Sequence, residues 1–184
     1  MKKTFIIIFI MTFALTSIVW GLKIGGKVLP GKIQAGDNEL TINGAGLRKK
    51  LIIKVYACAL YLMEKESDAK TIIEADEAIA VKMHFIYKAV APEKLIEAWN
   101  TGFAKSDISN LKEQITQFNA MFSADAKKDD VYDITYLPDT GSSLYINGKL
   151  IGTVPGFEFK KALFSIWFGN ETELPKLRDR MLGK

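Results

Sequence analysis

Arg48 stands at the start of a stretch that soon becomes almost entirely apolar and extends to Leu62. A guanidinium group presents a planar fork of N–H donors that matches a carboxylate or another oxyanion. An arginine next to an apolar stretch of chain therefore predicts a pocket for an amphipathic ligand with one acidic end, or for an enolate. The alternative is an ordinary surface arginine at the beginning of a strand.

The other side chains with reactive groups point to no further chemistry. Cys58 is the only cysteine, so an intramolecular disulfide is excluded and we expect a small buried side chain. His84 is the only histidine, and no second histidine or acid lies at metal-ligand spacing from it. We therefore expect His84 at the surface, no metal site and no cofactor.

The N-terminus has the features of a secretory signal. Met1-Lys2-Lys3 precedes an apolar stretch over 4–20, and Gly21 suits cleavage before Leu22. We expect residues 1–21 to be a signal peptide and residues 22–184 to form a single domain. The protein would then be exported, periplasmic or secreted, with no stable membrane span. The alternative is an N-terminal helix that stays uncleaved as an anchor.

The charge pattern argues against nucleic acid as a partner. The net charge is +4, but the lysines are scattered, and Lys127-Lys128 is followed at once by Asp129-Asp130. A protein that follows a phosphate backbone has a basic stripe, which this sequence lacks. The partner that we expect is a small amphipathic acid.

The elements that must position Arg48 come in alternating blocks. Predicted strand regions are 26–62, 79–88 and 131–154, with a hairpin turn at Asn147-Gly148. Predicted helices are 68–73, two between 92 and 122, one from 157 to 168 and one over 173–182. Such blocks indicate an α+β fold with a large antiparallel sheet and a layer of helices on one face. The apolar run up to Leu62 predicts a strand covered on both faces.

Three segments together resemble the chalcone isomerase fold family, particularly its bacterial chalcone isomerase-like branch. They are 44–48 continuing into 54–62, the helical region 92–122, and 162–169. The resemblance covers essentially the chain from residue 22 onward. It implies an open-faced sandwich, in which a large antiparallel sheet packs against α-helices with a ligand cleft between them.

The same resemblance implies a role for Arg48. In the plant isomerases, the matching arginine holds the substrate while a chalcone cyclises to a flavanone. In the related fatty-acid-binding proteins, it binds the lipid carboxylate together with a tyrosine. Tyr56 stands where the isomerases typically carry a threonine. The pair Arg48 and Tyr56 therefore resembles the fatty-acid-binding branch.

Other positions depart from the isomerase pattern. Ala91 and Ala98 replace a tyrosine and an asparagine, and Lys160 replaces a serine or threonine. We predict an exported noncatalytic protein that holds a fatty acid or similar amphipathic carboxylate, with Arg48 and Tyr56 as ligand-binding residues. The alternatives are a chalcone-flavanone isomerase-type enzyme, acting as an intramolecular lyase or isomerase, and a structural or assembly factor of the cell envelope.

The two-residue site requires a turn between its members. On one straight strand, Arg48 and Tyr56 would be about 26 Å apart at roughly 3.3 Å per residue, too far to share a ligand. A tight turn near Lys49-Lys50 would place them on adjacent strands. The small side chains of 57–59 either leave room for the tail of the ligand or pack closely under a helix.

Overall fold

The computed structural model describes residues 21–184, so the predicted signal peptide lies outside the described residues except for Gly21. Its main sheet is antiparallel, with the order β11-β10-β9-β6-β5-β4-β3. The strands are β3 (Lys32–Ala35), β4 (Asn38–Lys50), β5 (Ile53–Leu62), β6 (Ile79–Phe85), β9 (Val131–Leu137), β10 (Gly141–Ile146) and β11 (Lys149–Val154). Strands β6 and β9 pair directly in the sheet, although a helical insertion separates them in the chain.

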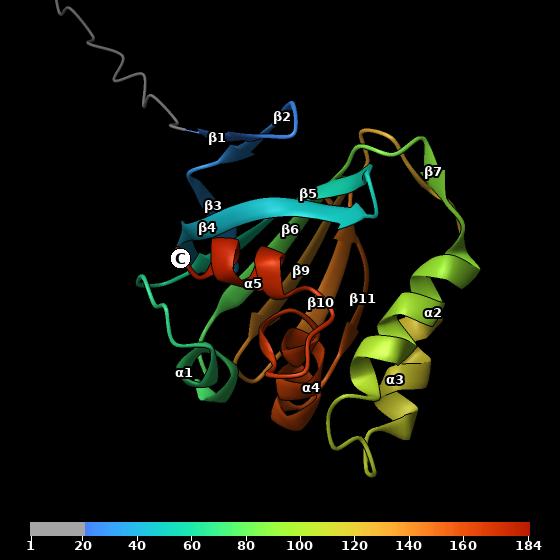
Figure 1. Ribbon diagram of the computed structural model, residues 1–184. Helices are drawn as coiled ribbons and strands as arrows, with labels where there is room; N and C mark the ends of the chain where they lie inside the picture. The colour runs from blue at the N-terminus through green and yellow to red at the C-terminus, as the bar shows by residue number, and fades with distance from the viewer. Residues whose placement is uncertain (1–20) are drawn as a thin grey trace, which may run out of the picture.

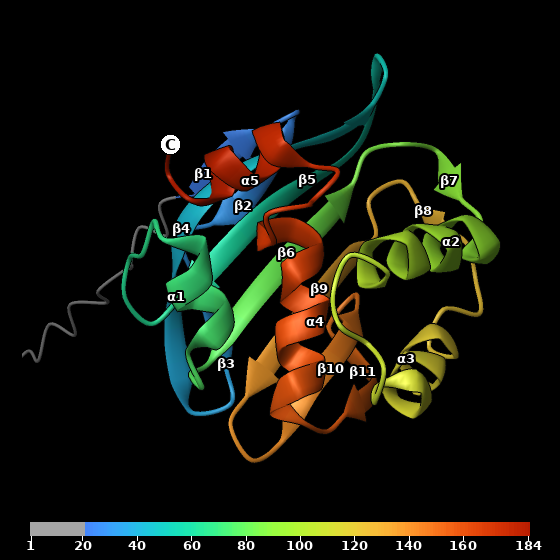
Figure 2. The ribbon, with the colours of Figure 1, turned by 60° about the horizontal axis from the view of Figure 1, so that its bottom comes forward.

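The helices of the described chain lie on one side of this sheet, as Figures 1 and 2 show. They are α1 (Ala69–Glu74), α2 (Pro92–Phe103), α3 (Lys112–Asn119), α4 (Phe157–Phe168) and α5 (Pro175–Met181). The α+β prediction, with helices layered on one face of an antiparallel sheet, is confirmed. No helix within residues 21–184 is long and apolar enough to span a membrane.

The larger hydrophobic core fills the space between the sheet and the helices. Helix α4 lies at its centre, and Phe159, Leu163, Phe164, Trp167 and Phe168 are fully buried. A helix that is apolar nearly all round must be enclosed by other elements. The prediction of a mostly buried helix here is therefore confirmed.

A hairpin of β1 (Gly21–Ile24) and β2 (Lys27–Pro30) covers part of the opposite face of the sheet. Leu29 of this hairpin is fully buried, and the hydroxyl of Tyr61 donates to the Pro30 carbonyl at 2.8 Å. Residues 57–61 of β5 are all fully buried, which confirms the prediction of a strand covered on both faces. The expectation that residues 26–62 form one meander is wrong for β2, because β1 and β2 pair only with each other.

Short elements lead the chain from the sheet to the helical pair. Strand β6 ends at Phe85, three residues before the predicted end, because the amides of Ile86 and Tyr87 both donate to the Val55 carbonyl. Strands β7 (Ala89–Val90) and β8 (Ala126–Lys127) then pair with each other. This small ladder closes the insertion that carries α2 and α3.

Helix α5 packs closely on β4 where the strand carries glycine. A Cβ added at Gly44 would lie 2.3 Å from the Arg180 carbonyl oxygen and 2.6 Å from that of Met181. Backbone atoms cannot yield at such distances without moving the helix. Gly44 therefore permits the contact that holds the C-terminal helix against the sheet.

Candidate ligand-binding site

The β4–β5 hairpin places Arg48 directly opposite Tyr56 in the sheet. The strands are joined at Leu51-Ile52, so the required turn exists but comes slightly later than the Lys49-Lys50 position expected from the sequence. The expectation that Arg48 begins the apolar strand is wrong, because Arg48 belongs to β4 and the apolar run is β5. Residues opposite each other project from the same face of a sheet.

A cavity of about 510 Å³ opens on that face, between the sheet and helices α2 and α4. This volume falls within the range of roughly 300–1,000 Å³ that small-molecule sites occupy. Most of its wall is apolar, contributed by Val55, Tyr56, Met83, Phe85, Val90, Leu95, Trp99, Ile166, Trp167 and Leu174. Such a lining is suited to an aliphatic or aromatic ligand body.

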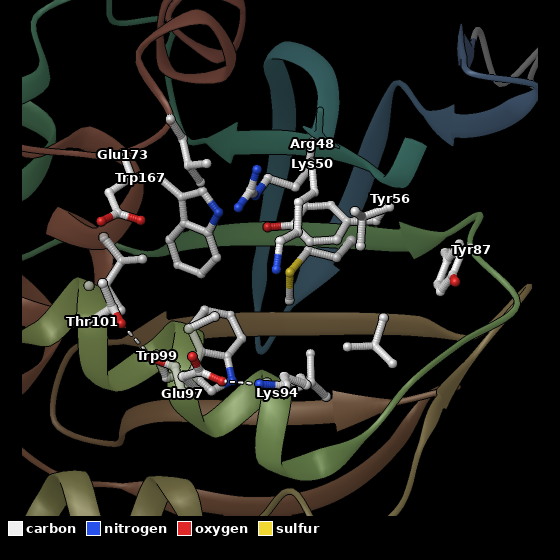
Figure 3. A pocket seen from close by; sticks show the side chains of 18 of the residues that line it. Arg48, Lys50, Tyr56, Tyr87, Lys94, Glu97, Trp99, Thr101, Trp167 and Glu173 are labelled. Carbon is white, nitrogen blue, oxygen red and sulfur yellow. Dashed lines mark hydrogen bonds and ion pairs between the residues drawn. The ribbon is translucent and has the colours of Figure 1, made fainter. Parts of the chain in front are cut away.

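Three hydrogen-bond donors meet at one end of this cavity. Figure 3 shows the Arg48 guanidinium, the Trp167 indole nitrogen and the Tyr56 hydroxyl directed toward one another. Arg48 donates to the carbonyl of Lys49 and forms no ion pair with any of the described residues. Its remaining N–H groups are therefore available to an anionic ligand.

The Tyr56 phenol stays protonated at neutral pH. Burial raises its pKa above the ordinary value, the nearby Cys58 adds to this shift, and the positive charge of Arg48 opposes it. A protonated phenol donates its O–H to a carboxylate. The site predicted from the sequence, Arg48 with Tyr56, is thus brought together by the hairpin.

Trp167 is the member of this group that the sequence analysis missed. Its indole Nε1 is buried and has no hydrogen-bond partner among the described residues. Leaving a buried N–H without a partner costs roughly 1–3 kcal/mol, so its position calls for an acceptor. In the sequence Trp167 appears only as one of many apolar residues in a helix, although an indole in such a helix always has an N–H to satisfy.

Both signs of charge are present at the cavity. Lys50, Lys94 and Lys105 line it together with Glu97 and Glu173. Lys94 pairs with Glu97 at 2.6 Å, both side chains being exposed, and each shifts the pKa of the other toward the charged form. At the Arg48 end, an unpaired positive charge lies beside the Tyr56 hydroxyl and the buried Trp167 N–H.

The three departures from the isomerase pattern fall in different places. Ala91 and Ala98 line the cavity and offer it only methyl groups. Lys160 lies outside it, fully buried, and donates to the carbonyls of Ile72, Ile73 and Ala75 at 2.7–2.9 Å. The Lys160 ammonium group therefore joins α4 to the end of α1.

Several other expectations have clear outcomes. Cys58 is fully buried, and burial raises the pKa of its thiol. His84 is half-buried rather than at the surface, and burial lowers its pKa. Among residues 21–184, no three His, Cys, Asp or Glu side chains are grouped so that they could hold a metal ion. Residues 57–59 do not line the cavity, so the interpretation that they leave room for a tail is wrong.

A family model described as chalcone isomerase-like matches residues 21–183. The chain belongs to the chalcone isomerase-like family. The family resemblance of the sequence is therefore confirmed. A sequence search of the curated proteins gives no match.

The chalcone isomerase-like fold is also present in a solved structure. The crystal structure of a fatty-acid binding protein from Arabidopsis thaliana superposes with a TM-score of 0.70. The two sequences are 20% identical, and the match covers 85% of this chain and 92% of the plant chain. This likeness confirms the open-faced sandwich expected from the sequence.

Proposed function

We propose that this chain is a noncatalytic binding protein that holds a fatty acid or a similar amphipathic carboxylate. The observation that carries the proposal is the meeting of three donors, from Arg48, Tyr56 and Trp167, at one end of an otherwise apolar cavity. The carboxylate accepts hydrogen bonds from all three, and the tail lies along the apolar wall. The plant fatty-acid binding protein of the same fold supports this assignment.

The cavity favours binding over cyclisation for a chemical reason. An isomerase of this family must orient a phenolate against an enone, which requires hydrogen-bonding groups placed along the substrate. Ala91 and Ala98 supply none along the α2 side of the cavity. Flavanone formation from a chalcone at a catalytic rate would contradict the proposal and favour the enzyme alternative.

The direct test is native mass spectrometry of the purified protein, followed by denaturing extraction of any bound molecule. We expect a carboxylic acid that is lost from an Arg48→Ala variant. Titration calorimetry with hexadecanoate and hexadecanol then isolates the contribution of the carboxylate to the affinity, since the two ligands have the same hydrocarbon chain. Equal affinities for the acid and the alcohol would overturn the proposed role of the donor group.

We further propose that the protein is exported, with cleavage before Leu22. The basic start and apolar stretch of residues 1–20 support this, as does a family match that begins at residue 21. The intact mass of the protein recovered from the cells that make it tests the proposal. A mass that includes residues 1–21 would contradict cleavage.

A further inference from the structure

The apex of the β4–β5 hairpin exposes three large apolar side chains side by side. Leu51 and Ile52 are each 93% exposed and Ile53 is 45% exposed. Figure 2 shows this hairpin reaching beyond the rest of the fold. Single exposed apolar residues are common, but a contiguous group at a projecting tip indicates an interaction surface.

Backbone requirements do not explain these residues. Leu51 adopts a left-handed conformation with φ 55°, which is unfavourable for a residue with a bulky side chain. The β10–β11 turn of the same sheet instead uses Asn147 and Gly148, with φ 53° and 80°, the residue types that such turns prefer. The side chains at the apex therefore serve a purpose other than turn formation.

Positive charge surrounds the apolar apex. Lys49, Lys50 and Lys54 are exposed, and Lys49 stands directly opposite Lys54 in the sheet. No acidic residue occurs from 44 to 63, and these lysines form no ion pair within the described part of the chain. Like charges facing each other across two strands destabilise the pair unless an anion lies nearby.

We propose that this hairpin tip docks the protein on an anionic lipid bilayer. Apolar side chains with lysines just behind them are suited to the boundary between acyl chains and acidic headgroups. Two residues of extended chain separate the apex from Lys49 and Lys54, about 7 Å at 3.3 Å per residue. When Leu51 and Ile52 enter the acyl boundary, the lysines therefore lie at the level of the phosphates.

The docked hairpin brings the ligand cavity to the membrane. Lys50 and Ile53 belong to the apex region and also line the cavity beside Arg48. A lipid-derived acid can then pass between bilayer and cavity without crossing water. This consequence rests on the proposed function, whereas the docking itself does not.

A second copy of the chain fits the tip less well than a bilayer does. A stable protein interface buries roughly 800 Å² on each partner, more than three side chains on a narrow projecting turn can supply. The lysines also oppose a symmetric contact, because each copy would bring the same positive charge to it. A fluid anionic surface satisfies both the small apolar tip and its positive surroundings.

The first test measures how deeply the hairpin tip inserts into the bilayer, with a nitroxide probe attached to the full chain. Ile52→Cys carries the probe, and Asp37→Cys, exposed in the β3–β4 turn at the other end of the sheet, carries the control probe. Cys58 is fully buried, so labelling is confined to the introduced thiol. On vesicles of phosphatidylglycerol and phosphatidylcholine, we expect the probe at 52 to be shielded from a water-soluble paramagnetic reagent and accessible to oxygen dissolved in the bilayer. The probe at 37 should stay accessible to the water-soluble reagent.

The second test compares matched substitutions by vesicle flotation without fatty acid. Leu51→Ser with Ile52→Ser should weaken binding to anionic vesicles by about tenfold or more, since two apolar side chains leave the interface. Leu150→Ser with Ile151→Ser makes the same change at an exposed pair on edge strand β11 and should leave binding unchanged. Raising the salt concentration should weaken docking, because exposed lysines are screened.

Three results would overturn the docking proposal. They are a probe at 52 that stays in water on anionic vesicles, equal docking on pure phosphatidylcholine, and shielding at 52 that appears without vesicles, which indicates self-association. Both docking tests are carried out without fatty acid, and binding of the fatty acid is measured without vesicles. A failure of docking and a failure of the proposed ligand role are therefore distinguishable.

Discussion

Arg48 and Tyr56 face each other across β4 and β5, although eight positions separate them in the chain. The register is strongly determined, because a one-residue slip would move every side chain of β5 to the other face of the sheet. Cys58 and Leu60 would then leave the helical core to which they belong. The packing of β5 thus holds Arg48 and Tyr56, the two residues proposed to bind the ligand, on one face.

Arg48→Ala should weaken binding of an acidic ligand by about 1.5–3 kcal/mol, the range for a hydrogen bond to a charged group. Titration calorimetry with hexadecanoate measures the change. The matched control is Arg180→Ala, because Arg180 is exposed and lies outside the cavity. Unfolding of the Arg48 variant under the same conditions would instead identify Arg48 as a structural residue.

Tyr56→Phe should cost about 0.5–1.5 kcal/mol of binding free energy, since one neutral donor is removed while the ring remains. Burial keeps the pKa of Tyr56 above its ordinary value, so the phenol remains a donor between pH 6 and pH 9. We expect the ratio of wild-type to variant affinity to stay constant over that interval. A ratio that falls within it would show that the phenol ionises.

Trp167→Phe should also lower the affinity for the acid, by about 0.5–1.5 kcal/mol, because the unpartnered indole N–H is lost and an apolar ring is retained. The alcohol of the same chain length provides the control ligand. Affinity for the alcohol should fall less than affinity for the acid. An equal loss for both ligands would mean that Trp167 contributes only apolar packing.

Lys160→Met should lower the free energy of unfolding by about 1–3 kcal/mol, since one buried and two partly buried carbonyls lose their donor. Burial lowers the pKa of Lys160 to about 8, against the opposing effect of nearby acids. Between pH 8 and the ordinary lysine value, the unfolded chain binds more protons at this residue than the folded chain does. The contribution of Lys160 to stability therefore rises with pH over that interval.

Urea denaturation of wild type and Lys160→Met at pH 7.5 and pH 9.5 measures this difference. Other groups titrate equally in both proteins, so the difference in their free energies of unfolding isolates the contribution of Lys160. We expect the advantage of the wild type to grow at the higher pH. A constant or smaller advantage would contradict the assigned cause of the pKa shift.

Gly44→Ala should destabilise the fold by about 1–3 kcal/mol or more, because the new methyl group meets the backbone of α5. Gly152→Ala is the matched control, since its Cβ meets only the flexible end of the Met121 side chain. Thermal unfolding followed by circular dichroism compares the two. Equal midpoints for both variants would show that α5 shifts away from β4 at little cost.

The sequence by itself determined the fold class and predicted which residues would form the site. Blocks of strand and helix periodicity, the apolar run of β5 and the Asn147-Gly148 turn are local features, and the structure confirms each of them. Arg48 beside apolar chain predicted an acidic, amphipathic ligand, and this stays a prediction. Local patterns carry this information because period and composition reflect which face of an element is buried.

The tertiary structure decided what depends on contacts between distant residues. It placed the unpartnered N–H of Trp167 beside Arg48, bound Lys160 to the end of α1, and laid the β1–β2 hairpin over the second face of the sheet. It also exposed Leu51 and Ile52, which in the sequence belong to an apolar run that only Lys54 interrupts. An apolar residue has the same identity in a core and at a hairpin apex, and only the packing around it decides which role it takes.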